Sequence, residues 1–89
     1  MIYHVTTKRK AERQLKRLPY QMQLRIMDGI IKLSNSSTWG DVRRLVNHQY
    51  DYRLRIGNYR VLFNLTEGGT LEIGEISVEE IKKRDDRTY

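Results

Sequence analysis

The sequence contains no cysteine, a single proline and no long run of hydrophobic residues. The absence of cysteine excludes disulfide bonds, thiolate metal sites and cysteine nucleophiles, and it is consistent with a reducing compartment. No apolar segment approaches the roughly 20 residues that a membrane-spanning helix requires. We therefore expect a cytoplasmic protein with no membrane partner, whose stability comes from packing alone.

The length and the charge of the chain narrow its class further. A chain of 89 residues can form one compact domain with a modest core, so we expect a single domain over residues 1–89. Lysine and arginine number 17 against 11 acidic residues, which gives a formal net charge of +6 at pH 7. This charge favours an anionic partner, namely nucleic acid, an acidic protein or an anionic surface, without choosing among them.

The sequence shows no pattern that is typical of a metal or nucleotide-cofactor site. His4 and His48 are far apart in the chain, and without cysteine they do not make up a ligand set. No glycine-rich loop leads from a strand into a helix, and Gly68-Gly69 is typical of a hairpin turn. We therefore expect no metal and no small-molecule cofactor.

The first half of the chain predicts one strand and two helices. Residues 1–7 alternate and are rich in β-branched side chains, which indicates a short strand. Helical spacing follows over residues 8–18, and Pro19 then ends that helix and begins a second one that runs to about Ser34. Residues 35–41 have the composition of a loop. The apolar stripe of the second helix, which we expect in the core, includes Met22, Ile26, Met27 and Ile30.

From Tyr50 onward the apolar period becomes two, which predicts strands. Residues 52–56 and 59–65 form the arms of a hairpin around Gly57-Asn58. A further strand is expected over residues 71–78, where Gly74 suggests a β-bulge. The residues that this bulge would turn toward the core are Leu71, Ile73, Ile76 and Val78. The pattern predicts an α+β fold: an N-terminal strand, a two-helix hairpin and an antiparallel strand meander, with the helices packed on one face of the sheet.

The hairpin places arginines on the side of the sheet opposite its apolar residues. A two-residue turn pairs Arg55 with Arg60, and Arg53 lies two residues further along the first arm. Like charges directly opposed in a sheet destabilise it by up to roughly 1 kcal/mol, so we expect an anionic ligand such as phosphate over these guanidinium groups. The alternative is an ordinary solvated face whose arginines form salt bridges, for example from Arg60 to Glu75.

The hairpin sequence resembles that of a known protein family. Tyr52–Phe63 reads YRLRIGNYRVLF, which is similar to the YRxRxGxYRxxY hairpin of the RelE family of toxin–antitoxin systems. The upstream helix pair and the basic tail ending in tyrosine are similar as well, so the resemblance covers nearly the whole chain. It implies a RelE-like fold and a ribosome-dependent endoribonuclease that cleaves mRNA and inhibits translation. It also implies three partners: the ribosome, mRNA and a cognate acidic antitoxin protein.

The resemblance assigns roles to individual residues of this chain. The family's basic strand residues fall on Arg53 and Arg55, and its transition-state-stabilising arginine falls on Arg60. Its tail arginine falls most nearly on Arg84, and its C-terminal tyrosine on Tyr89. The residues implied in catalysis are Arg55, Arg60, Arg84 and Tyr89, and those expected to contact RNA phosphates are Arg53, Arg55, Lys83 and Arg87.

The chain departs from the family at two places. Some members carry lysines where this chain has Arg53 and Arg55. The tail from Arg84 to Tyr89 reads RDDRTY, which is more acidic than is usual in the family. Arg84 and Arg87 therefore compete for the role of the tail arginine.

The proton transfers of such a reaction need residues other than arginine. Attack by the RNA 2′-hydroxyl requires a general base and a general acid, and arginine serves poorly because its pKa exceeds about 12. Tyr89 is the first candidate, because a tyrosine at a basic site can have a lowered pKa and can also stack on a base. Glu75 is the second candidate and His48 the third.

Two other functions are compatible with the sequence. ParE-type toxins resemble the RelE family in fold but poison DNA gyrase, and they generally lack the combined arginine set and the terminal tyrosine. A non-catalytic RNA-binding module would also use a basic sheet face. The alternation argues against this module, because it turns Tyr52 and Phe63 toward the core and leaves few aromatic rings for base stacking.

Overall fold

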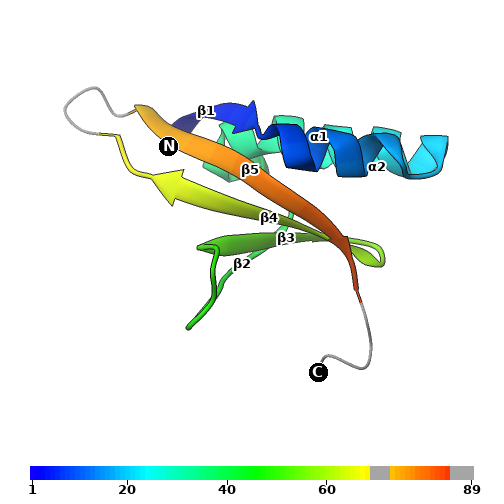
Figure 1. Ribbon diagram of the computed structural model, residues 1–89. Coiled ribbons are helices and arrows are strands. Elements are labelled where there is room, and N and C mark those ends of the chain that lie inside the picture. The colour runs from blue at the N-terminus through cyan, green and yellow to red at the C-terminus, as the bar shows by residue number, and fades with distance from the viewer. Residues whose placement is uncertain (69–72, 85–89) are drawn as a thin grey trace.

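A computed structural model of the chain describes residues 1–68 and 73–84. Helices and strands follow one another in the order that the sequence predicts, with one additional strand (Figure 1). The elements are β1 (Ile2–Thr7), α1 (Arg9–Lys16), α2 (Tyr20–Ile31), the short 3₁₀ turns η1 (Lys32–Ser34) and η2 (Ser36–Thr38), β2 (Asp41–Arg44), β3 (Tyr52–Ile56), β4 (Tyr59–Thr66) and β5 (Ile73–Lys83). Within the described residues, no helix has the length and apolar character needed to cross a membrane.

The five strands form one sheet in the order β1-β5-β4-β3-β2. β1 pairs in parallel with β5, and all other neighbours are antiparallel. Both helices lie on the same face of the sheet (Figure 1), which confirms the predicted α+β architecture. The edge strand β2 was not expected, because the four residues Asp41–Arg44 include three charged ones and show no apolar alternation.

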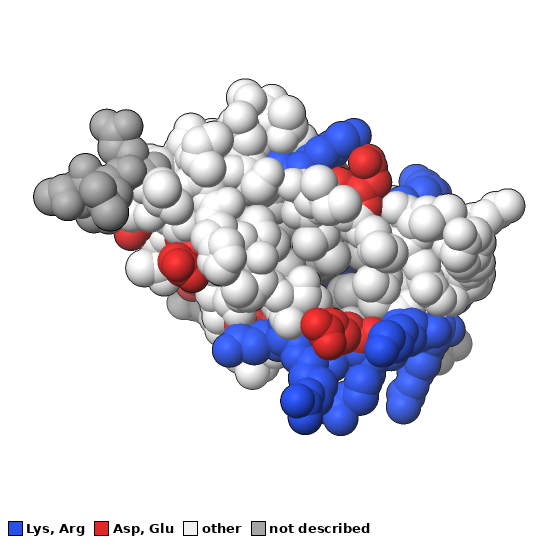
Figure 2. All heavy atoms as spheres, turned by 90° about the horizontal axis from the view of Figure 1, so that it is seen from above, with Lys and Arg blue, Asp and Glu red and all other residues white. Residues whose placement is uncertain are grey.

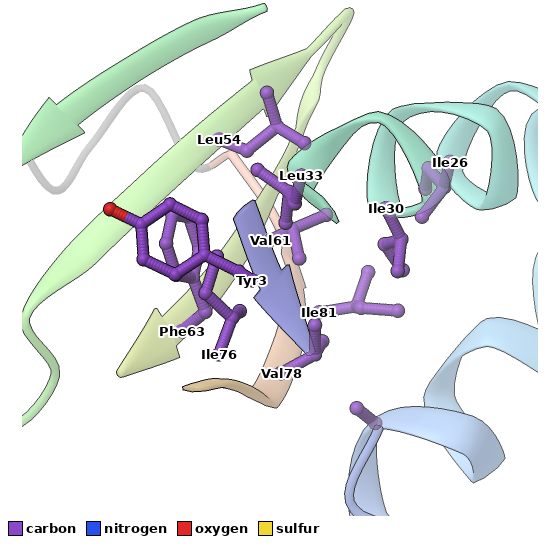
Figure 3. Close-up of a cluster of buried hydrophobic side chains, with 11 residues drawn as sticks. Tyr3, Ile26, Ile30, Leu33, Leu54, Val61, Phe63, Ile76, Val78 and Ile81 are labelled. Carbon is purple, nitrogen blue, oxygen red and sulfur yellow. The ribbon is translucent and has the colours of Figure 1, made fainter. Parts of the chain in front are cut away.

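The core lies between the sheet and the helices, and it draws on β1, both helices and strands β3 to β5 (Figure 3). Its largest fully buried side chains are Phe63, Ile26, Leu33, Ile76, Val61 and Val78. Trp39 closes one side, since its ring nitrogen donates to the Leu33 carbonyl at 2.8 Å and its ring lies edge-on to Phe63. Ile26 and Ile30 are buried as expected, but Met27 is 45% exposed, so the expectation of a core position was wrong for this residue.

The predicted bulge at Gly74 was wrong in its position. The register of β4 and β5 shifts between Leu62 and Phe63, where it skips Glu79 on β5. Gly74 pairs with Tyr3 of β1, and a Cβ there would lie 2.6 Å from the Tyr3 ring. This position therefore has no side chain because an aromatic ring occupies the space. Ile73 points to solvent rather than to the core, Ile76 and Val78 are buried as expected, and Leu71 lies outside the described residues.

A buried carboxylate links α1, β5 and the loop that precedes β3. The Tyr50 hydroxyl donates to Oε2 of Glu80 at 2.9 Å, while the Gln14 amide donates to Oε1 at 3.4 Å and the Lys10 ammonium lies 3.3 Å from it. Burial of Glu80 opposes its ionisation. The hydrogen bonds from Tyr50, Lys10 and Gln14, together with the charge of Lys82, outweigh burial and lower the pKa of Glu80 below its ordinary value.

This lowered pKa predicts a pH-dependent contribution to stability. A glutamate with a lowered folded-state pKa stabilises the fold above its unfolded pKa of about 4.3, and the contribution disappears as the pH falls through the folded-state pKa. We expect Glu80→Gln to reduce the free energy of unfolding by about 1–3 kcal/mol at pH 7 and by much less at pH 3. Urea unfolding at both pH values tests this. An equal loss of unfolding free energy at both pH values would contradict a stabilising role for the negative charge of Glu80.

Candidate functional site

The hairpin has the register predicted from its turn. β3 and β4 pair Ile56 with Tyr59 and Arg55 with Arg60, and they place Arg53 opposite Leu62. Because the side chains of directly paired residues point to the same side of a sheet, Arg53, Arg55 and Arg60 share one side. Leu54, Val61 and Phe63 of the same strands point into the core on the other side, whereas Leu62 shares the side of Arg53. The arginines therefore lie on the sheet face that the helices leave uncovered (Figure 1).

Four arginines line a single hollow of about 150 Å³ on this face, which we call the arginine hollow. Arg53 and Arg55 come from β3, Arg60 from β4, and Arg84 follows the end of β5. The backbone N–H of Arg84 donates to the carbonyl of Asn58, which attaches the end of β5 to the hairpin turn. The structure thus brings together four of the residues that the sequence singled out, from three separate segments.

The arginine hollow is strongly electropositive. Burial, followed by repulsion from Arg53 and Arg84, lowers the pKa of Arg60 below its ordinary value. A bound anion would relieve this repulsion, since opposite charge favours the ionised form. Guanidinium groups offer planar sets of donors that match phosphate oxygens, so phosphate suits the hollow in both charge and geometry.

The new strand β2 orients one of these arginines. The Arg53 guanidinium lies 3.3 Å from the Asp41 carboxylate and donates to the Asp41 backbone carbonyl at 3.0 Å. Asp41 also pairs directly with Arg55 in the sheet. β2 therefore supplies an acidic residue at the rim of the arginine hollow, which fixes the direction of Arg53.

The β5 bulge exchanges the roles of two neighbouring lysines. Lys82 pairs with Arg60 and therefore shares its side of the sheet, whereas Lys83 pairs with Tyr59 on the opposite side. Lys83 was the lysine selected from the sequence, and this placement argues against it as a phosphate contact. The sequence did not identify Lys82 as a residue of this face, because the bulge at Glu79 on the same strand has no recognisable signal in the sequence.

Neither Glu75 nor His48, the two candidate bases within the described residues, is among the residues that line the arginine hollow. Glu75 pairs with Thr66 at the far end of β5, 3.8 Å from the ring of His4, so the proposed approach of Glu75 to Arg60 was wrong. His48 lies in the loop before β3, where its Nδ1 accepts a hydrogen bond from the Tyr50 N–H at 3.1 Å. Tyr89 and Arg87 lie outside the described residues. Among residues 1–68 and 73–84, no group of acidic or histidine side chains could hold a metal ion.

Comparison with solved structures finds the same fold in chains of three toxin–antitoxin complexes. The chain resembles RelE chains from three complexes: RelBE2 of Mycobacterium tuberculosis (18% identity, TM-score 0.70, covering 94% of this chain and 100% of that one), RelE-RelB of Pyrococcus horikoshii (24%, 0.72, 97% and 99%), and RelB-RelE of Methanococcus jannaschii (22%, 0.64, 86% and 87%). No family model and no curated protein sequence matches the chain. The likeness establishes that this α+β domain has the RelE-type fold.

An anion test follows from the arginine hollow. Phosphate that binds only the folded state stabilises it, by about 1.4 kcal/mol at tenfold excess over its dissociation constant. We expect phosphate to raise the melting temperature above that in chloride of equal ionic strength, and Arg60→Gln to remove most of the increase. Arg9→Gln, which removes an exposed charge on α1, is the matched control. If both variants lost the same part of the increase in melting temperature, stabilisation by phosphate would depend on net charge alone and not on the arginine hollow.

Proposed function

We propose that this chain is the toxin of a type II toxin–antitoxin system and that it cleaves mRNA on the ribosome. The observation that carries the proposal is the convergence of Arg53, Arg55, Arg60 and Arg84 on one hollow in a domain of the RelE-type fold. The toxin acts in the cytoplasm, where ribosomes and mRNA are found. Neither a metal nor a cofactor takes part.

The reaction begins with attack of the RNA 2′-hydroxyl oxygen on the adjacent phosphorus. A new P–O bond forms, the bond to the 5′-oxygen breaks, and the products carry a 2′,3′-cyclic phosphate and a 5′-hydroxyl. Arg60, assisted by Arg55, stabilises the additional negative charge of the phosphorane, a contribution of about 3–4 kcal/mol for one well-placed donor. Arg53, held by Asp41, positions the phosphate, and Lys82 adds a further charge on the same side.

The proton balance needs a base for the 2′-hydroxyl and an acid for the leaving 5′-oxygen. The described residues that line the arginine hollow are arginines, which do not give up a proton near neutral pH. Tyr89 therefore remains our candidate for proton transfer and for stacking on a base. The alternative is that a group of the ribosome serves as the base or the acid. In either case the role of Arg60 in stabilising the phosphorane is unchanged.

Cleavage on translating ribosomes tests this function. We expect Arg60→Ala to reduce mRNA cleavage by about 10²- to 10³-fold, because one transition-state donor is lost, while the melting temperature stays close to that of the wild type. Arg13→Ala, an exposed change on α1, should retain full activity. Intact mRNA with the wild-type protein would contradict the proposal. Inhibition of DNA gyrase in the same preparation would then favour a ParE-type toxin, and RNA binding without cleavage a non-catalytic module.

The helical layer has the properties expected of an antitoxin-binding surface. Four large apolar side chains are exposed along α2 at helical spacing: Tyr20, Leu24, Met27 and Ile31. Met27 and Ile31 also line a groove of about 210 Å³ between the two helices, together with Leu15 and Ile30. Contiguous exposed apolar surface of this kind marks interaction sites in soluble proteins.

The charge beside this groove indicates the chemistry of the partner. Figure 2 looks down on the helices and shows lysines and arginines gathered along one edge. In residues 8–17, which include α1, the exposed basic side chains are those of Lys8, Arg9, Lys10, Arg13, Lys16 and Arg17. Two copies of the chain facing each other here would bring these cations together, which disfavours self-association. An acidic antitoxin segment with an apolar face complements both features.

Binding of the antitoxin tests this surface. We expect Ile31→Lys to weaken binding of the acidic protein that we propose as the antitoxin at least tenfold, since the variant places a charge in an apolar interface. Gln21→Lys adds the same charge to an exposed position of α2 and should have little effect. Both variants should cleave mRNA normally. Unchanged binding of Ile31→Lys would exclude the groove as the docking site.

A further inference from the structure

A second hollow lies beside the arginine hollow and shares one residue with it. This second hollow has a volume of about 260 Å³ and lies between α2 and β3. Arg55 lines both hollows. β2 begins at Asp41, which pairs with Arg55, so Ile56 extends past the start of β2 at the edge of the sheet. A ligand in the arginine hollow can therefore continue around this edge into the second hollow.

The floor of the second hollow is apolar and the rim is polar. Leu54 and Ile56 of β3 contribute side chains to the floor, and Gly40 contributes a position without a side chain. Arg25 of α2 and Lys32 of η1 contribute cations to the rim, and Asp28 of α2 contributes a carboxylate, 3.0 Å from the Lys32 ammonium. This combination suits a flat, largely apolar group with hydrogen-bonding edges better than it suits a second phosphate, which would gain nothing from the floor.

We propose that the second hollow binds the base of the nucleotide adjoining the phosphate in the arginine hollow. The proposal rests on the proposed function for the identity of that phosphate. The guanidinium of Arg55 has a role in both hollows: its N–H groups donate to the phosphate, and its plane stacks on the base. Stacking on arginine is a common way to hold bases of single-stranded RNA. The nucleotide thus spans the edge of the sheet at Arg55.

The rim also predicts which bases are accepted. The Asp28 carboxylate accepts a hydrogen bond from an exocyclic amino group, which adenine, cytosine and guanine carry. Uracil presents carbonyl oxygens on either side of its one N–H, and a carboxylate repels them. The toxin therefore disfavours uracil at the adjoining position, and Asp28→Asn, which replaces the carboxylate by an amide that can also donate, reduces this discrimination.

The experiment uses trinucleotides with 2′-deoxyribose, which cannot be cleaved, and observes the backbone amide signals of the complete chain by NMR. We expect inorganic phosphate to shift signals around Arg53 and Arg60 only. An adenine-containing trinucleotide should shift these and also the signals of Gly29, Gly40 and Ile56, and bind at least fivefold more tightly than a uracil trinucleotide. Trinucleotide shifts confined to the arginine hollow, or no preference over uracil, would overturn the proposal.

Two variants separate the hollows. A Cβ at Gly40 would lie 3.4 Å from the Leu54 side chain, an ordinary contact, so Gly40→Leu fills the second hollow without backbone strain. This variant should bind phosphate normally, lose the second set of shifts and bind the adenine trinucleotide at least fivefold more weakly. Arg25→Gln should weaken trinucleotide binding, and Arg13→Gln is its control. Base binding in a protein that does not cleave mRNA would contradict the proposed function alone.

Discussion

The structure depends on the pairing of β3 with β4, which sets Arg55 against Arg60. Repulsion between these two guanidinium groups destabilises the sheet by up to roughly 1 kcal/mol. On the other side of the same two strands, Leu54 pairs with Val61 and both are buried. Full burial of one such side chain contributes about 1.5–3 kcal/mol, so the core side decides the register. A slip of one residue would expose the apolar set, and the arginines are therefore held together by core residues on the opposite side of the sheet.

The acidic residues keep this concentration of charge compatible with a stable fold. Asp41 contacts Arg53 from the edge strand β2, and Glu80 lies on β5, where the ammonium groups of Lys10 and Lys82 are within 4 Å of its carboxylate. Among the described residues, the lining of the arginine hollow is made of arginines, and neither carboxylate belongs to it. Each carboxylate reduces the repulsion among the basic side chains that it contacts.

The predictable parts of this molecule are those that local sequence determines. The Gly57-Asn58 turn and the alternation on either side of it were sufficient to give the hairpin register and the arginine set. β2 could not be predicted in this way, because its pairing with β3 is determined by the loop between them and not by an apolar pattern. The bulge at Glu79 also has no recognisable pattern in the sequence. This bulge determines that Lys82, rather than Lys83, pairs with Arg60 and shares its side of the sheet. The second hollow also depends on tertiary structure, since α2 and β3 meet only in the folded chain.

The proposed RNA site and the proposed antitoxin-binding surface lie on opposite sides of one small domain. The arginine hollow lies on the sheet face that the helices leave uncovered, whereas the exposed apolar stripe belongs to α2, in the helical layer on the other face. A helix bound at the stripe would not cover the hollow, because the sheet separates the two surfaces. A partner that blocks RNA must therefore extend around the domain or bring a second acidic segment to the arginines. This geometry favours a long, partly disordered partner over a compact one, since a flexible chain can reach both faces at once.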